Sequence, residues 1–291
     1  MTHVVTLIAA REATSLTETT IGLVRDAIGG GVLTVLSSGE AVDLACDLAP
    51  DLDRVRAALD GAPIDAIATT ADTRRKRLLI ADMDSTIVTG ETLDELAAYA
   101  GLGEKIAAIT ARAMNGELDF KAALRERVGM LKGLGVDALE RTWRGIRLTP
   151  GALELVATMK AHGAITALVS GGFTYFTSRV ASLVGFDLHR ANELLDDGSA
   201  LLGRVGEPIL DRSAKLATLR ELTERHGLAA RDTMAVGDGA NDLDMLLASG
   251  LGIAFHAKPI VAAAAQARVE HGDLRALLFA QGYPAGAFTG A

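Results

Sequence analysis

The sequence predicts an α/β protein whose main domain is a doubly wound parallel sheet, with an all-helical insertion and a small α+β domain at the N-terminus. Short, continuous apolar runs alternate with helical patterns from residue 77 onward, as buried strands and crossover helices do in parallel sheets. Only helical patterns occur between residues 91 and 145. Before residue 73, short strand patterns and glycine-rich turns indicate a separate unit.

Composition sets the broad class of the protein. The chain has 291 residues, of which 49% are apolar and 23% charged, so we expect two globular domains with a further small insertion rather than a disordered chain. A net charge of −8 argues against a general nucleic-acid surface, and no apolar run reaches the ~18 residues of a membrane span. The first residues lack the basic segment of a signal peptide, and the single cysteine, Cys46, excludes an intrachain disulfide. We therefore expect a cytoplasmic protein with neither nucleic-acid nor membrane partners.

Residues 1–72 are predicted to form the small α+β domain. Strands are expected at residues 4–9, 32–36, 41–48 and 64–69, and helices at residues 17–28 and 52–59. The triplet Gly29-Gly30-Gly31 ends the first helix, and Gly61 with Pro63 ends the second. The resulting order, β-α-β-β-α-β, is that of the ferredoxin-like split βαβ motif.

The rest of the chain is predicted to form the parallel sheet and a helical cap. Residues 77–90 and 146–285 are assigned to the sheet domain, and residues 91–145 to the cap. Strands are expected at residues 77–81, 164–169, 232–236 and 252–255, and a hairpin at residues 194–202. Helices are expected at residues 91–99, 104–114, 120–129, 136–144, 151–162, 173–183 and 215–226.

Acidic residues follow two of these strands, at the sheet edge where parallel strands end and ligands bind. Asp82 and Asp84 follow the first strand, and Asp238 and Asp242 follow the third. A single aspartate is commonly a helix N-cap or a turn residue, and for Asp242 that interpretation is as good as a functional one. Carboxylates crowded into one crevice repel one another, and a divalent cation with oxygen ligands relieves the repulsion. We therefore predict a Mg²⁺ site.

The loop after the second strand is a candidate anion site. Ser170-Gly171-Gly172 is expected to open a helix, which would place a hydroxyl and free backbone N–H groups where an anion binds, although the same residues are ordinary turn formers. Lys215, expected at the start of a helix, is either a solvated residue or a point charge for a phosphate. No Gly-x-x-x-x-Gly-Lys motif is present, so a nucleotide P-loop is excluded.

Taken in order, these motifs resemble the four motifs of the haloacid dehalogenase superfamily, and most closely those of its phosphoserine phosphatases. The resemblance covers about residues 78–283. It rests on Asp82-Met-Asp84-Ser-Thr86, Val169–Phe173, Lys215 and Val236–Asp242, together with Glu91 and the spacing of Met114, Phe120 and Arg127. Residues 1–72 resemble the ACT-like domain that is fused to bacterial members.

The resemblance implies a Mg²⁺-dependent phosphomonoesterase. Asp82 would attack phosphorus and form an aspartyl-phosphate, and Asp84 would protonate the leaving oxygen and then activate water. Mg²⁺ would be held by the carboxylates of Asp82 and Asp238 and by the main-chain carbonyl of Asp84. The phosphoryl group would be held by Ser170, the Gly171 N–H, Lys215 and Asn241, with Thr86, Gly172 and Asp242 as supporting residues.

The implied substrate is O-phosphoserine, hydrolysed in the last step of serine biosynthesis. Glu91 would face its ammonium group, Arg127 would bind its carboxylate, and Met114 and Phe120 would form apolar walls. All four lie in the cap, which can close over the crevice as a lid. From the residues alone, Arg127 belongs to a charged, solvated helix face, and Met114 and Phe120 belong to a core.

Other functions stay open at this point. A related phosphatase or phosphotransferase acting on another small phosphomonoester would keep the same chemistry. A non-catalytic, amino-acid-binding regulatory protein would use residues 1–72, but it would have no need of the crowded carboxylates. The same residues are the expected contact of a homodimer.

Overall fold

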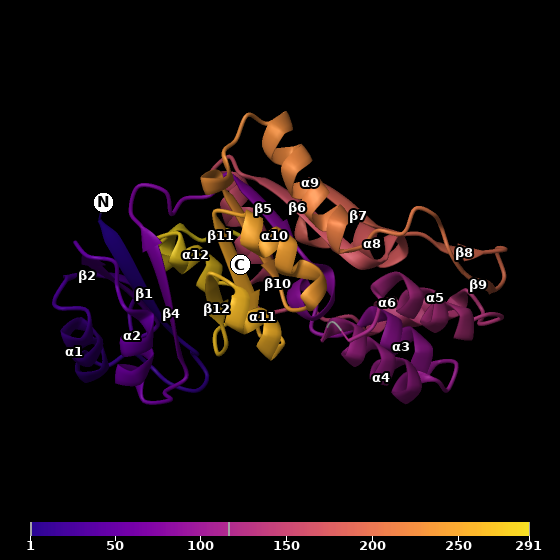
Figure 1. Ribbon diagram of the computed structural model, residues 1–291, viewed down its shortest axis with the longest axis horizontal. Helices are drawn as coiled ribbons and strands as arrows, with labels where there is room; N and C mark the ends of the chain where they lie inside the picture. The colour runs from indigo at the N-terminus through magenta and orange to yellow at the C-terminus, as the bar shows by residue number, and fades with distance from the viewer. Residues whose placement is uncertain (1, 116, 291) are drawn as a thin grey trace.

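The computed structural model describes residues 2–115 and 117–290, which form an N-terminal antiparallel sheet, a central parallel sheet and a group of helices at the opposite end (Figure 1). The N-terminal sheet has the strand order β2-β3-β1-β4, with antiparallel neighbours. Its strands are β1 (His3–Ala9), β2 (Val32–Ser37), β3 (Ala41–Cys46) and β4 (Ile64–Thr70), and its helices are α1 (Glu18–Ala27) and α2 (Leu52–Leu59). Thr17 and Asp51 cap the two helices with side-chain oxygens. The predicted element order is confirmed.

The two edges of the N-terminal sheet have different surroundings. Strand β4 lies against the parallel sheet, because Asp65 accepts hydrogen bonds of 2.7 Å from the backbone N–H groups of Glu270 and Gly272. Strand β2 pairs with β3 alone among the described residues. Its side chains Val32 and Val35 are 70% and 58% exposed, so β2 presents an apolar strand edge to solvent.

The parallel sheet has the strand order β12-β11-β10-β5-β6-β7, and every neighbouring pair is parallel. Its strands are β5 (Leu78–Ala81), β6 (Ile165–Phe173), β7 (Leu188–Asn192), β10 (Thr233–Gly237), β11 (Leu251–Phe255) and β12 (Ala267–Val269). At the end of β5, Ala81 pairs with Leu168 of β6 and Val236 of β10. The residues that follow these three paired positions therefore lie side by side.

Helices cover both faces of this sheet, so it is doubly wound as predicted. Leu78 and Ile80 of β5 face one side, where they pack with α9 (Arg212–Arg225), α10 (Leu243–Ala248) and α11 (Pro259–Ala264). Leu79 and Ala81 face the other side, where they pack with α7 (Ala152–Ala161), α8 (Thr174–Val184) and α12 (Ala276–Ala280). The alternation follows from the two-residue period of a strand, whose successive side chains point to opposite faces.

Between β5 and β6 the chain forms the helical cap, defined here as α3 (Thr92–Ala98), α4 (Gly103–Met114), α5 (Phe120–Met130) and α6 (Asp137–Gly145). The predicted hairpin is present as β8 (Leu194–Asp196) and β9 (Leu201–Val205), and it lies beside α5 (Figure 1). The segments that enter and leave the cap form an antiparallel bridge between Val88 and Leu148. The tight turn Met83–Ile87 joins β5 to this bridge, and single 3-10 turns occur at Ala230–Asp232, Ala240–Asp242 and Ala285–Ala287.

Three local expectations need correction. Strands β7 and β12, at the two edges of the parallel sheet, were not predicted. Ser170-Gly171-Gly172 does not open a helix, because β6 continues to Phe173 and α8 begins at Thr174. Helix α9 begins at Arg212 rather than at Lys215, because the Asp211 carboxylate caps it by accepting from the Ser213 and Ala214 N–H groups. No helix within residues 2–115 or 117–290 has the length and hydrophobicity that a membrane crossing requires.

Candidate active site

The loop after β5 places two carboxylates side by side at the end of the sheet. The Asp82 N–H donates to the Val236 carbonyl at 3.0 Å, which keeps Asp82 in line with the strand. The chain then turns sharply, with Ser85 at a φ of 53°. Asp84 Oδ1 accepts a hydrogen bond of 3.0 Å from the Thr92 N–H, so the start of the cap fixes this side chain. Burial, and next the neighbouring Glu91, raise the pKa of Asp84 well above its ordinary value.

A buried lysine lies against the first of these carboxylates. The Lys215 side chain is 1% exposed, and its Nζ is 2.8 Å from Asp82 Oδ2 and 2.5 Å from Asp242 Oδ1. Burial by itself lowers the pKa of Lys215, but the Asp242 and Asp82 carboxylates outweigh it and hold the pKa above its ordinary value. Lys215 is therefore a fixed cation beside Asp82 and not a solvated residue.

Asp82, Asp238 and Asp242 each place a carboxylate oxygen within 4.8 Å of the others, a spacing suited to a metal ion. Both Asp238 oxygens are buried without a hydrogen-bond partner among the described residues. Burial and then the nearby Asp242 raise the pKa of Asp238 well above its ordinary value. Asp242 is already engaged, because it contacts Lys215 and accepts from the Gly239 N–H at 3.1 Å. The unpaired oxygens of Asp238 are thus the stronger indication of a cation site.

The last residues of strand β6 close the opposite side of the site. Ser170 is 1% exposed, its Oγ accepts from the Gly172 N–H at 2.9 Å, and it lies 3.5 Å from Asp84 Oδ2. Neither glycine has room for a side chain. A Cβ on Gly171 would meet the Phe120 ring at 2.7 Å, and one on Gly172 would meet Asp84 Oδ2 at 2.8 Å. The predicted cluster of hydroxyl and backbone N–H groups is present, but on an extended strand end.

The helical cap encloses a small cavity of about 50 Å³ over these loops. Its walls come from the loop after β5, the end of β6 and the turn after β10. Residues at α3, α4 and α5 of the cap complete them. They comprise Asp82, Asp84, Glu91, Leu93, Thr110, Ala113, Phe120, Leu124, Arg127, Ser170, Gly171, Gly172 and Asn241. Of the predicted site residues, Asp238, Asp242 and Lys215 lie around Asp82 instead of in this wall.

Arg127 contradicts the expectation of a solvated helix face. It is 6% exposed, and its guanidinium donates to Thr110 Oγ1 at 2.9 Å and to the Ala123 carbonyl at 3.2 Å. No carboxylate of the described residues forms an ion pair with it. Burial lowers the pKa of Arg127 below its ordinary value, and the charges of Asp94 and Glu91 offset this only in part. The cavity therefore contains a buried cation that lacks an anionic partner.

The other predicted residues have varied surroundings. Glu91 Oε1 accepts from Ser85 Oγ at 2.5 Å, and burial raises the pKa of Glu91. Asn241 lines the cavity, and its Oδ1 has no partner among the described residues. Thr86 is fully buried and lies outside the cavity wall. Met114 ends α4, but its side chain lies outside the part of the chain that the structure describes.

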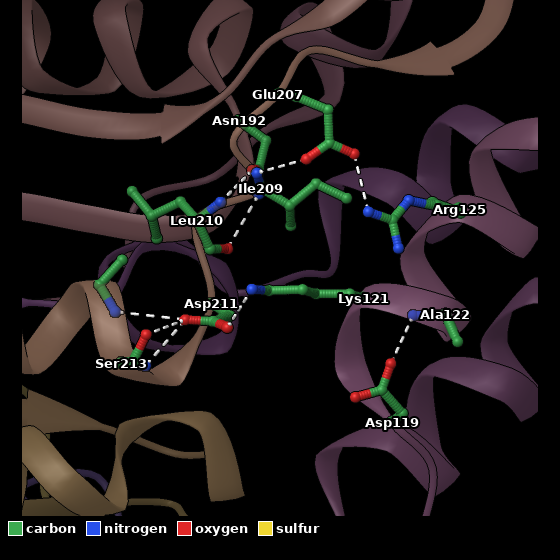
Figure 2. Close-up of polar contacts among 11 residues, drawn as sticks. Asp119, Lys121, Ala122, Arg125, Asn192, Glu207, Ile209, Leu210, Asp211 and Ser213 are labelled. Carbon is green, nitrogen blue, oxygen red and sulfur yellow. Dashed lines mark hydrogen bonds and ion pairs between the residues drawn. The ribbon is translucent and has the colours of Figure 1, made fainter.

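Two ion pairs join the cap to the sheet domain beside the cavity (Figure 2). Lys121 Nζ is 2.8 Å from Asp211 Oδ2, and an Arg125 Nη is 2.7 Å from Glu207 Oε1. The other Asp211 oxygen caps α9, the helix that carries Lys215. The motifs did not indicate these four residues, nor Thr110, because each contact joins segments far apart in the sequence.

Known proteins of similar sequence share the part of the chain that carries these motifs. Residues 79–247 match the haloacid dehalogenase-like hydrolase family. The chain is 48% identical over 188 residues to a phosphoserine phosphatase from Archaeoglobus fulgidus, covering 65% of this chain and 55% of that one. It is 40% identical over 205 residues to a phosphoserine phosphatase from Methanocaldococcus jannaschii, covering 70% of this chain and 97% of that one. Some relatives are longer, and the chain spans about half the length of the Archaeoglobus protein.

Two solved structures extend the comparison. A substrate-bound phosphoserine phosphatase complex superimposes with a TM-score of 0.68 at 40% identity, covering 70% of this chain and 98% of that one. A haloacid dehalogenase family hydrolase from Salmonella enterica serovar Typhi has a TM-score of 0.83 at 30% identity and covers 95% of this chain and 98% of its own. The second similarity includes nearly the whole chain, so it extends into the N-terminal sheet.

Proposed function

Because the chain belongs to the haloacid dehalogenase-like hydrolase family, we propose that it hydrolyses O-phosphoserine to serine and inorganic phosphate, the last step of serine biosynthesis. The observation that carries the choice of substrate is Arg127, a buried cation without a carboxylate partner in the described part of the chain. It shares one cavity with Asp82 and Asp84, and with Glu91, which offers a carboxylate to an ammonium group. A small substrate with a phosphate, a carboxylate and an ammonium group complements these charges.

In the proposed reaction, the Asp82 carboxylate attacks phosphorus while the bond from phosphorus to the serine oxygen breaks. Asp84 donates a proton to that oxygen, so serine leaves as the alcohol. A water molecule then attacks the aspartyl-phosphate, Asp84 takes its proton, and phosphate leaves with Asp82 regenerated. Asp84 Oδ2 lies 3.5 Å from Ser170 Oγ. This short distance supports the proposal that Asp84 transfers protons next to Ser170, which would bind the phosphoryl oxygens.

The fixed charges around Asp82 would bind and orient the phosphoryl group. Lys215 and the Ser170 hydroxyl, with the Gly171 N–H, neutralise the charge of its oxygens as the bond breaks. We assign Mg²⁺ to the carboxylates of Asp82 and Asp238 and to the main-chain carbonyl of Asp84, since carboxylate and carbonyl oxygens are the ligands that it prefers. When bound, Mg²⁺ supplies positive charge that reduces the repulsion between the carboxylate nucleophile and the phosphate.

The arrangement of the chain supports a division of roles. We propose that residues 77–90 and 146–285 form the catalytic core, that residues 91–145 form a cap that selects the substrate, and that residues 1–72 form an ACT-like domain. The exposed edge of β2 favours a homodimer, because two copies of this strand can pair antiparallel about a twofold axis and bury Val32 and Val35.

The decisive experiment measures phosphate release from O-phosphoserine, phosphoethanolamine and an aryl phosphate, each in excess chelator and after addition of Mg²⁺. We expect phosphoserine to be preferred and activity to depend on Mg²⁺. Asp82→Asn should abolish release while the circular dichroism spectrum stays unchanged, because the amide is isosteric but a poor nucleophile. Full activity in chelator, or in Asp82→Asn with deamidation excluded by mass spectrometry, would contradict the proposal.

A further inference from the structure

The direction of the Arg127 guanidinium is set by a chain of hydrogen bonds that crosses three cap helices. Asp94 lies on α3, Thr110 on α4 and Arg127 on α5. Thr110 Oγ1 is 2.6 Å from Asp94 Oδ1 and 2.9 Å from an Arg127 Nη. None of the three residues lies in a catalytic loop, and Asp94 and Thr110 belong to no motif in the sequence.

Which group donates in each of these hydrogen bonds follows from which groups carry protons. A hydroxyl has one proton to donate and lone pairs to accept, and a guanidinium can only donate. The Thr110 proton therefore points to the Asp94 carboxylate at 2.6 Å, a shorter contact than the 3.1 Å to the Ile106 carbonyl. This leaves a Thr110 lone pair facing Arg127. Asp94 thus fixes Thr110 as an acceptor for the guanidinium.

The arrangement leaves the rest of the guanidinium available. Its Nε donates to the Ala123 carbonyl, and the described residues offer no acceptor to its second terminal nitrogen. If Asp94 contacted Arg127 directly, it would occupy the planar fork that binds a carboxylate in bidentate fashion. With Thr110 between them, the Asp94 charge stabilises the guanidinium without occupying the fork.

We infer that Thr110 and Asp94 are positioning residues that determine specificity, because they hold Arg127 in the orientation that receives a substrate carboxylate. The inference rests on the proposed phosphoserine phosphatase activity and adds residues to its recognition site. It predicts that the contribution of Thr110 is confined to substrates with a carboxylate next to the phosphoester.

The test replaces Thr110 with valine, which keeps the shape and removes the hydroxyl. Thr142→Val is the matched control, since Thr142 is also a cap threonine, is 2% exposed, and its hydroxyl has no partner among the described residues. kcat and KM are measured for O-phosphoserine, for phosphoethanolamine, which lacks the carboxylate, and for an aryl phosphate. We expect Thr110→Val to lower kcat/KM for phosphoserine roughly 3- to 12-fold, mainly through KM, as for the loss of one hydrogen bond. The other two substrates should change less than about twofold.

Two further variants keep the test informative if Thr110→Val folds poorly. Thr110→Ser should retain phosphoserine kinetics, because it keeps the hydroxyl. Asp94→Asn should weaken phosphoserine selectively, because it removes the carboxylate that fixes the direction of the Thr110 proton and the negative charge that stabilises the guanidinium. An equal loss on all three substrates, or no loss on phosphoserine, would overturn the inference while leaving the proposed function intact. A wild-type protein that hydrolyses the aryl phosphate but not phosphoserine would instead refute the proposed substrate, and the inference with it.

Discussion

Replacing Lys215 with methionine removes the ammonium group that lies between two buried carboxylates. Lys215 Nζ is 2.8 Å from Asp82 and 2.5 Å from Asp242, and the lysine side chain is 1% exposed. Methionine has a similar length and volume, so the change creates little cavity. It leaves the two carboxylates buried without their cation. Breaking a buried ion pair in this way costs about 3–5 kcal/mol.

We therefore expect the free energy of unfolding of Lys215→Met to fall by about 3–5 kcal/mol, measured by urea denaturation in excess chelator. Adding Asp242→Asn should recover a large part of the loss, because one of the two unpaired charges disappears. Lys105→Met, a change at an exposed cap lysine, is the control and should stay within about 0.5 kcal/mol. A Lys215→Met protein within about 1 kcal/mol of wild type, or no recovery in the double variant, would refute this account of the buried charges.

Two further predictions concern substrate choice and assembly. Arg127→Met should lower kcat/KM for phosphoserine about 10- to 150-fold, as for one lost charged hydrogen bond, and change an aryl phosphate less than about twofold; equal losses would mean that Arg127 supports the cap or the phosphate instead. Val35→Lys, at the exposed edge of β2, should yield a monomer by sedimentation at concentrations where the wild type is a dimer, and a wild-type monomer would argue against the proposed homodimer.

The fold could be predicted where the sequence carries a simple period. Strand β5 is a continuous apolar run, and its burial on both faces follows from that run alone. Strand β7 was missed because Leu188–Asn192 is an edge strand whose histidine, arginine and asparagine resemble a loop. Strand β12 spans only Ala267–Val269 and was too short to stand out. In both cases pairing with a distant neighbour, not local sequence, creates the strand.

The residues alone predict the part of the site that lies in the loops, whereas in the cap Glu91, Phe120 and Arg127 were indicated only by the family resemblance. Asp82 and Asp84 follow a buried strand and Ser170 lies near the end of the neighbouring one, so the topology of a parallel sheet already brings them together. The burial of Arg127 could not be foreseen from the residues alone, because charged neighbours surround it on α5 and its contact with Thr110 comes from α4. Thr110 gives no local signal, since its role depends on two residues brought to it by helix packing.

The bridge between Val88 and Leu148 gives the cap a narrow attachment, because its first and last segments leave the sheet side by side. Asp82, Ser170 and Lys215 lie on the sheet-domain side of this attachment, whereas Arg127 lies on the cap side. Evolution can therefore lengthen, trim or exchange the chain between these two points without moving Asp82 or Ser170, provided that the start of α3 keeps the Thr92 N–H that fixes Asp84. A chain built in this way can acquire a different substrate through changes in one interchangeable module, while its chemistry is inherited unchanged.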